Sequence, residues 1–179
     1  MSAILMFLLV VFGGLAAVVL FVVGLYNGLI QARNAYRNAF AQIDVQLKRR
    51  ADLVPNLVET VKGYAAHEQQ VFEEVARSRQ AMMNARNVNE SAEAANMMSA
   101  ALGRLFAIAE NYPQLRANEN FLLLQEELSG VENKIAYARQ FYNDSVLEYN
   151  NKLQQFPTAF YAKILNFERR EYFETDEAA

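Results

Sequence analysis

The sequence lacks cysteine and tryptophan, and its 179 residues include one histidine, three prolines and seven glycines. Without cysteine there is no disulfide framework, no thiolate metal ligand and no cysteine nucleophile. The single histidine, His67, excludes a multi-histidine metal centre within one chain. The scarcity of proline and glycine favours long helices over a fold with many turns.

Charge is absent from the first part of the chain, because none of the 17 basic and 20 acidic residues precedes Arg33. The net charge of −3 gives no general attraction to nucleic acid, so we expect no nucleic-acid partner. Residues 3–26 are instead wholly apolar, glycine or aromatic. As a helix this run reaches about 36 Å, enough to cross a hydrocarbon core of about 30 Å with some tilt.

Two other interpretations of this run are weaker. A cleaved signal peptide has a basic start and a shorter apolar core, and a buried core helix rarely contains so long an apolar run. We therefore predict a transmembrane anchor over residues 1–30 that contacts the lipid bilayer through residues 3–30. Several basic residues and one acid, Asp44, follow the span, so the positive-inside rule places the N-terminus outside and the rest in the cytoplasm.

Beyond the anchor, apolar residues recur every three or four positions from Tyr36 to Ala65, which is typical of one helix face. Pro55 lies inside this stripe. It removes a backbone donor, so we expect a kink or a new helix start there, with Asp52 as a possible cap. Whether one helix continues through Pro55 stays open at this point.

Two further helices follow a polar stretch at residues 84–93. Asn89 or Ser91 can cap the first, which ends before Pro113. The second carries the clearest stripe, from Phe121 to Phe156 over roughly 36 residues, and Asn118 or Asn120 can cap it. Pro157 ends it, and Thr158 can cap a short terminal helix through about residue 166.

A long amphipathic helix must bury its stripe against partner helices, and the chain supplies several with short connections. We therefore predict an all-α fold: an N-terminal transmembrane helix followed by an antiparallel, four-helix-type, coiled-coil-like bundle of long helices. The predicted domains are the anchor at 1–30, the bundle at 31–173 and an acidic flexible tail at 174–179. No segment shows the sustained alternation typical of a sheet.

The sequence offers little for catalysis. A di-iron bundle site needs Glu-x-x-His on two helices, which one histidine cannot provide, and no glycine-rich phosphate loop or Gly-x-Ser-x-Gly elbow occurs. We predict no catalytic residues, no metal and no cofactor, and therefore no enzyme. His67 is interpreted as an exposed residue at a helical bend rather than a pH sensor. The basic triplet at 48–50 is interpreted as a solvated face, or as ion partners of Asp44 or Asp52, rather than as a lipid site.

Two Tyr-Asn pairs, at 142–143 and 149–150, lie one heptad apart on the last stripe. Asparagine is a poor residue inside a helix, and a buried amide must find partners. We therefore predict that these polar groups fix the register between helices.

Small residues in the anchor point to self-association. Gly13, Ala17, Gly24 and Gly28 step by four, seven and four residues and share one helix face. Such a stripe lets two membrane helices approach closely, so we expect a homo-oligomer formed partly through the anchor.

Several segments together resemble the LemA family of bacterial proteins. They are Tyr26-Asn27, the run from Ile43 to Leu57, the run from Tyr112 to Phe121, the run from Glu132 to Arg139, both Tyr-Asn pairs and Phe156-Pro157. The resemblance covers nearly the whole chain, from the anchor to about Phe173. It implies an N-terminal membrane helix and a helical bundle in a bacterial cell, at the inner membrane, and it carries over no catalytic residue.

Our leading hypothesis is a membrane-anchored scaffold or adaptor that acts through protein contacts, with an unknown protein partner, or through self-association. The alternative is a membrane-remodelling or envelope-organising component that assembles on the bilayer. An enzyme is the third and weakest hypothesis, because the serines are scattered and no base accompanies them.

Overall fold

The structure is a computed structural model that describes residues 2–174, which are almost wholly helical and contain no strand. This confirms the all-α fold. The helices are α1 (Ser2–Lys62), α2 (Gln69–Asn84), α3 (Val88–Ala109), α4 (Pro113–Arg116), α5 (Glu119–Gln154) and α6 (Thr158–Ile164). The chain divides into two compact units, and α1 and α5 each contribute to both.

Among the described residues, unit 1 comprises 2–37 and 145–170, and unit 2 comprises 38–144 and 171–174. The domain boundaries expected from the sequence stay predictions. In the expected flexible tail, Glu174 is exposed, whereas residues 175–179 lie outside the described residues.

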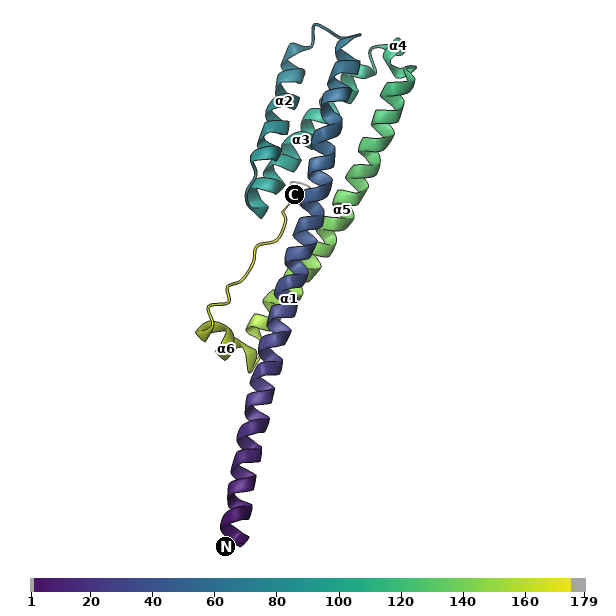
Figure 1. The fold of residues 1–179 in the computed structure, drawn as a ribbon. Coiled ribbons are helices and arrows are strands. Elements are labelled where there is room, and N and C mark those ends of the chain that lie inside the picture. The colour runs from purple at the N-terminus through teal and green to yellow at the C-terminus, as the bar shows by residue number, and fades with distance from the viewer. Residues whose placement is uncertain (1, 175–179) are drawn as a thin grey trace. The chain divides into compact units, whose positions relative to one another are not determined.

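Unit 2 is a helical bundle in which the long segments of α1, α2, α3 and α5 run alternately in opposite directions (Figure 1). The predicted stripes supply its core, because residues three and four apart share a face. Among the least exposed core side chains are Ile43, Val54, Leu57, Val61, Val75, Met98, Leu105, Leu115 and Ile135.

Helix α1 runs through Pro55 without a break, so the expectation of a new start capped by Asp52 is wrong. A proline has no N–H, and the carbonyl of Ala51, four residues earlier, therefore lacks its helical donor. Arg79 of α2 replaces that donor, since its Nε donates to the Ala51 oxygen at 2.8 Å. The helix therefore tolerates Pro55 with the help of a neighbouring helix.

The N-terminus of α3 differs from the expectation of an Asn89 or Ser91 cap. Asn87 is the cap, because its Oδ1 accepts from the Glu90 N–H at 2.9 Å, and Glu90 Oε2 accepts from the Arg86 N–H at 2.7 Å. This reciprocal pattern satisfies two donors at once. For α5 the expected Asn118 cap is confirmed, with its Oδ1 accepting from Phe121 N–H at 3.0 Å.

Unit 1 has a more aromatic interior. The rings of Tyr36 and Tyr149 lie 5.0 Å apart between centroids, and both residues are buried. Tyr26 meets the Phe167 ring edge-on at 6.2 Å, and the Arg33 guanidinium lies 5.7 Å from the centroid of that ring. Aromatic pairs therefore join α1 to the C-terminal segment that follows α6.

The end of α5 follows the prediction only in part. The helix stops at Gln154, before Pro157, as expected, but Phe156 is exposed rather than part of the buried stripe. Thr158 does not cap α6 through its side chain. It is buried in the first helical turn, and α6 has no side-chain cap bond at its N-terminus.

The two Tyr-Asn pairs form hydrogen bonds to the extended C-terminal segment. Within unit 2, Asn143 exchanges two hydrogen bonds with the Phe173 backbone at 2.8 and 3.2 Å, and Tyr142 donates to the Glu171 carbonyl at 3.0 Å. The expectation that these groups fix the register between helices stays a prediction, since the rings of Tyr142 and Tyr149 also contact Phe40 and Tyr36 of α1. The hydrogen bonds hold an irregular segment, whose backbone groups need partners from elsewhere.

Within unit 1 the same pattern occurs one heptad later. Asn150 donates to the Arg170 carbonyl and accepts from the Arg170 N–H, both at 2.9 Å, and Tyr149 donates to the Glu168 carbonyl at 3.1 Å. Asn150 is buried, so these bonds satisfy an amide that has lost its contact with water.

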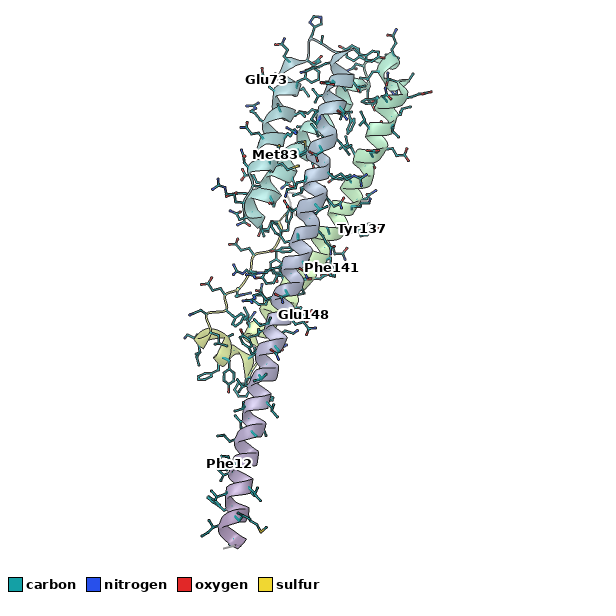
Figure 2. All side chains as sticks on the ribbon, viewed as in Figure 1. Phe12, Glu73, Met83, Tyr137, Phe141 and Glu148 are labelled. Atoms are coloured by element: carbon teal, nitrogen blue, oxygen red, sulfur yellow. The ribbon has the colours of Figure 1, made fainter. Side chains whose placement is uncertain are left out.

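The N-terminal part of α1 leaves its apolar side chains exposed. Residues 3–21 are all exposed, including Phe12, which projects from the helix in Figure 2. By length and composition, α1 is the one helix among the described residues that qualifies as a membrane span. So large an exposed apolar surface marks a site of contact with lipid or protein.

Candidate functional site

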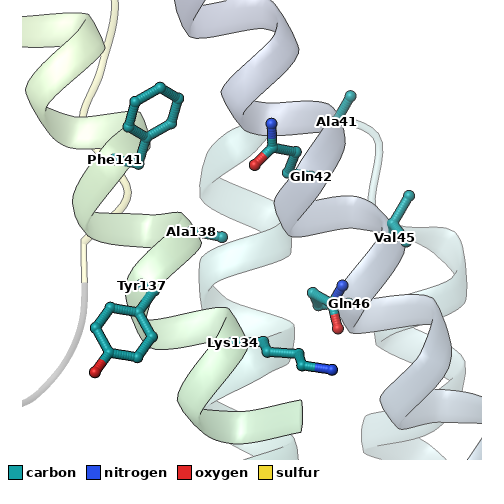
Figure 3. Close-up of a pocket in the computed structure, with 8 residues that line it drawn as sticks. All are labelled: Ala41, Gln42, Val45, Gln46, Lys134, Tyr137, Ala138 and Phe141. Atoms are coloured by element: carbon teal, nitrogen blue, oxygen red, sulfur yellow. The ribbon is translucent and has the colours of Figure 1, made fainter.

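A groove on the surface of unit 2, between α1 and α5, combines exposed aromatic rings with short side chains (Figure 3). Its volume is about 560 Å³. Tyr137 is 75% exposed and Phe141 is 53% exposed, and Val45 on α1 is also exposed. In Figure 3 the Tyr137 ring lies on the side of α5 away from α1, while Ala138 points towards α1. The groove is therefore shallow, apolar and flanked by aromatic side chains.

The polar members of this groove come from both helices. Gln42 and Gln46 extend from α1 towards α5, and Lys134 extends from α5 towards α1 (Figure 3). The Gln46 Oε1 atom is buried and makes no hydrogen bond to another described residue. The groove thus offers amides and one cation beside its aromatic rings, a mixture typical of protein-contact surfaces.

A second cavity, of about 360 Å³ between α3 and α5, contains a buried charge. The Arg50 side chain is 5% exposed, and its Nη2 lies 2.8 Å from Glu132 Oε2 and donates to Ser99 Oγ at 3.1 Å. Its Nε and Nη1 make no hydrogen bond within residues 2–174. Arg50 therefore links α1 to α3 and α5 through a single nitrogen.

The charge state of Arg50 decides what this cluster can do. Burial lowers the pKa of the Arg50 guanidinium, the Glu132 carboxylate raises it, and the like charge of Arg139 lowers it again. A guanidinium still keeps its proton near neutrality, because its ordinary pKa is far above that range. Arg50 therefore holds a fixed positive charge and is unsuited to proton transfer.

The sequence interpretation missed Arg50, because it treated the basic triplet at 48–50 as solvated or as local ion partners. For Lys48 that interpretation is confirmed: it pairs with Asp44 at 2.7 Å, and this hydrogen bond raises the pKa of the Lys48 ammonium. For Arg50 it is wrong. Arg50 lies three residues after Leu47 and four before Val54, so a strict reading of the stripe places it on the buried face.

The remaining candidates for chemistry do not come together. His67 is exposed in the turn between α1 and α2, as expected. Ser78 is buried and donates to the Val75 carbonyl at 2.9 Å, and Ser99 donates to the Ala95 carbonyl at 3.1 Å. Among the described residues, no group of three or more histidine and carboxylate side chains is placed to hold a metal ion. The expected absence of catalytic, metal and cofactor residues stays a prediction.

The small-residue stripe of the anchor has no packing role within the chain. A Cβ atom added at Gly13, Gly24 or Gly28 would meet no other atom within 4 Å. Glycine destabilises the interior of a helix by roughly 1 kcal/mol relative to alanine. Because no neighbouring atom of the chain occupies the space beside these glycines, packing within the chain does not explain their presence.

Comparison with known proteins identifies one matching family and several individual relatives. A sequence model of the LemA family matches residues 39–179. Magnetosome protein MamQ of Magnetospirillum gryphiswaldense is 27% identical over 174 residues, which cover 83% of this chain and 64% of that protein. Magnetosome protein MamQ 2 of Paramagnetospirillum magneticum is 25% identical over 179 residues, with coverages of 86% and 66%.

Protein LemA of Metamycoplasma hominis is 26% identical over 157 residues, which cover 87% of this chain and 71% of that protein. The chain spans just under two thirds of the length of the MamQ relatives. The family match starts at residue 39, close to the first residue of unit 2, Asn38.

Proposed function

The chain belongs to the LemA family, and from that membership we propose that it is a membrane-anchored helical scaffold that acts through protein contacts or self-association and not through catalysis. The single observation that carries this proposal is the coexistence of an exposed apolar helix with an exposed aromatic groove. Residues 3–21 are exposed, and so are Tyr137 and Phe141. Both surfaces are apolar, and their exposure to water is unfavourable. Both are therefore suited to contact with an external partner.

The first partner in this proposal is the lipid bilayer, contacted through residues 3–30. A helix satisfies its own backbone hydrogen bonds and can therefore cross the hydrocarbon core. The basic residues that follow, Arg33 and Arg37, support an orientation with the N-terminus outside and the bundle in the cytoplasm. A reporter fused after Ala179 is expected to be active in the cytoplasm, and activity only outside would reverse this orientation.

The second partner is a copy of the same chain, in contact partly through the anchor. The open space around Gly13 and Gly24 supports this, because a second helix backbone can approach there. The full chain in a mild detergent, measured by light scattering coupled to gel filtration, is expected to be larger than a monomer. Gly13→Leu with Gly24→Leu is expected to shift it towards the monomer, while Val10→Leu serves as the matched control.

A foreign partner distinguishes an adaptor from a self-assembling scaffold. Crosslinking in native membranes, followed by purification of the intact chain, is expected to recover either dimers of the chain or a stoichiometric second protein. Large assemblies that form only on lipid would favour the alternative of a membrane-remodelling component. A monomer without crosslinked partners in native membranes would contradict the scaffold proposal in both of its forms.

A further inference from the structure

Helix α6 in unit 1 leaves apolar side chains exposed opposite its buried face. Thr158 and Ala162 are buried, whereas Phe160 is 66% exposed and Ile164 is 62% exposed. At about 100° per residue, the exposed pair lies on the opposite side of the helix from the buried pair. A surface helix normally carries polar residues there. Packing within the chain therefore explains one face of α6 and does not explain the apolar residues on the other.

Large apolar side chains are also exposed at both ends of α6. Phe156, in the turn that precedes the helix, is 92% exposed, and Leu165, directly after the helix, is exposed as well. Isolated exposed apolar residues are ordinary, but four large ones between positions 156 and 165 are not. Such a concentration marks a contact with lipid or with protein.

The C-terminal end of α6 is fixed against α1. Asn166 has a φ of 55°, the left-handed conformation that ends many helices, and the Phe167 N–H donates to the Ala162 carbonyl at 2.9 Å. The Phe167 ring in turn contacts two groups of α1. Its centroid lies 6.2 Å from that of the Tyr26 ring and 5.7 Å from the Arg33 guanidinium. Helix α6 therefore lies beside the stretch of α1 between these two residues.

This stretch of α1 is where its apolar run gives way to charge. Tyr26 is the last residue of the apolar run, and Arg33 is the first charged residue of the chain. They are about 10 Å apart along the helix. Tyrosine is enriched where a spanning helix meets the headgroups, and arginine lies in or beyond that layer. When α1 spans the bilayer, Phe167 and the adjoining α6 therefore lie at the level of the headgroups.

The charge around α6 suits an anionic lipid surface. Residues 149–167 contain two lysines and no acid. Lys152 pairs with Glu148 at 2.7 Å, whereas Lys163 of α6 is exposed and forms no ion pair within residues 2–174. Exposed apolar residues with a lysine beside them are typical of helices that lie in the membrane interface. The same face of a second copy would bring two positive segments together, so lipid is the better partner.

We propose that the exposed face of α6, formed by Phe160 and Ile164 with Phe156 and Leu165 at its ends, lies in the headgroup layer of the bilayer that α1 spans. Helix α6 is too short to cross the bilayer and forms a second, interfacial contact with it. This inference rests on the membrane anchoring in the proposed function and extends the lipid contact beyond residues 3–30. Two separate contacts also fix the orientation of unit 1 about the axis of the anchor.

Tryptophan fluorescence tests this contact directly, because the chain has no native tryptophan. The full chain carrying Phe160→Trp is reconstituted into vesicles of equal amounts of phosphatidylcholine and phosphatidylglycerol. Bromine atoms on the lipid, which quench tryptophan, are placed either near the headgroup or near the end of the acyl chain. Phe160→Trp is expected to lose most of its emission only with the bromines near the headgroup, because an interfacial helix inserts by about 5–10 Å. Ile164→Trp is expected to give the same result.

Two variants of the same design calibrate the measurement. Phe12→Trp, near the middle of the apolar run, is expected to be quenched most by the bromines at the end of the acyl chain. Phe141→Trp, at an exposed aromatic position of unit 2, is expected to be quenched by neither lipid. All four substituted positions are exposed, and an unchanged circular dichroism spectrum checks that the variants fold.

An added charge provides the second readout. Ile164→Glu in the Phe160→Trp chain is expected to reduce the quenching by the bromines near the headgroup, because a carboxylate is repelled by the anionic headgroups and resists burial. The same Ile164→Glu change in the Phe12→Trp chain is expected to leave the quenching of the anchor unchanged. Equal quenching of Phe160→Trp with and without Ile164→Glu would contradict contact through this face.

The outcomes separate this inference from the proposed function. If Phe12→Trp is quenched while Phe160→Trp and Ile164→Trp are not, this inference is overturned and the anchor stands. Blue-shifted emission of Phe160→Trp without quenching by either lipid shows that protein covers α6, and this also overturns the inference. If Phe12→Trp is not quenched either, both the interfacial contact and the membrane anchoring of the proposed function are overturned.

Discussion

The two units of the chain are stabilised by different kinds of interior. Unit 2 buries mainly aliphatic side chains between four helical segments, with Ile43, Leu105 and Ile135 almost inaccessible to water. Unit 1 contains fewer helical segments, and its interior includes Tyr36, Tyr149 and the amide of Asn150. Where there are too few helices to enclose a core, hydrogen bonds to an extended segment contribute more of the specificity. The two units should therefore respond differently to the same class of mutation.

Deleting core atoms in unit 2 should give the largest effect. Ile135→Ala is expected to destabilise unit 2 by about 2–5 kcal/mol, because a fully buried side chain leaves a cavity. Thermal and urea unfolding of the full chain in detergent, followed by circular dichroism, measures the change. Leu123→Ala, at an exposed position on the same helix, is the control and should change stability by less than about 0.5 kcal/mol. Equal effects at both sites would contradict the assignment of the core.

Removing one amide tests the polar interior of unit 1. Asn150→Leu is expected to cost about 1–3 kcal/mol, because the N–H and carbonyl of Arg170 both lose their partner. Asn143→Leu, the same change in unit 2, should cost less because Asn143 is only half-buried. Hydrogen exchange at the amides of Arg170 and Phe173 follows each site separately. A larger effect at Asn143 would reverse the comparison between the units.

The buried ion pair tests whether unit 2 also depends on polar contacts. Glu132→Leu is expected to cost about 1–2 kcal/mol, which is below the usual range for buried pairs because the Glu132 side chain is 43% exposed. Arg50→Met combined with Glu132→Leu should recover part of that loss, since no uncompensated charge remains. If the double variant is less stable than Glu132→Leu alone, the hydrogen bond from the guanidinium to Ser99 stabilises the fold more than the uncompensated charge destabilises it.

A pH series should produce the smallest effect, and in unit 1. Burial raises the pKa of the Tyr149 hydroxyl, Tyr36 raises it further, and the charges of Arg170, Arg33 and Arg37 lower it in part. The folded state therefore holds this proton more tightly than the unfolded state. Stability is expected to fall as the pH rises above the ordinary tyrosine value of about 10.

Tyr149→Phe is the matched variant for this series. It should lose the Glu168 hydrogen bond at neutral pH and should show a shallower loss of stability at alkaline pH than the natural chain. Urea midpoints at several pH values between neutrality and the alkaline limit provide the measurement. Parallel slopes for both proteins would assign the alkaline transition to another group.

Much of the helical pattern follows from the sequence, because it depends on contacts between residues three and four apart. The stripes of α1, α3 and α5, the end of α5 before Pro157 and the Asn118 cap are all local features of this kind. The Asn87 cap was equally local. Asn87 and Glu90 form a recognisable capping box that the sequence interpretation overlooked.

The parts that the sequence did not predict depend on residues far apart in the chain. Asn143 and Asn150 bond to backbone groups 30 and 20 residues away, and no periodicity indicates that partner. The groove at Tyr137 and Phe141 was missed for another reason. The sequence interpretation followed the buried stripe of α5 and overlooked its outer face, although the three- and four-residue spacing there was visible in the sequence.

Pro55 in α1 affects how specifically α2 packs against α1. Two helices that pack ridge into groove can often keep similar contacts after one slides by a turn, about 5.4 Å, so neighbouring arrangements compete in energy. The Ala51 carbonyl that Pro55 leaves without a helical donor distinguishes one arrangement from the others. Only in this arrangement does Arg79 Nε lie beside a carbonyl that lacks a helical donor. A residue that weakens its own helix thereby widens the energy gap between the native packing of α2 and its nearest competitors.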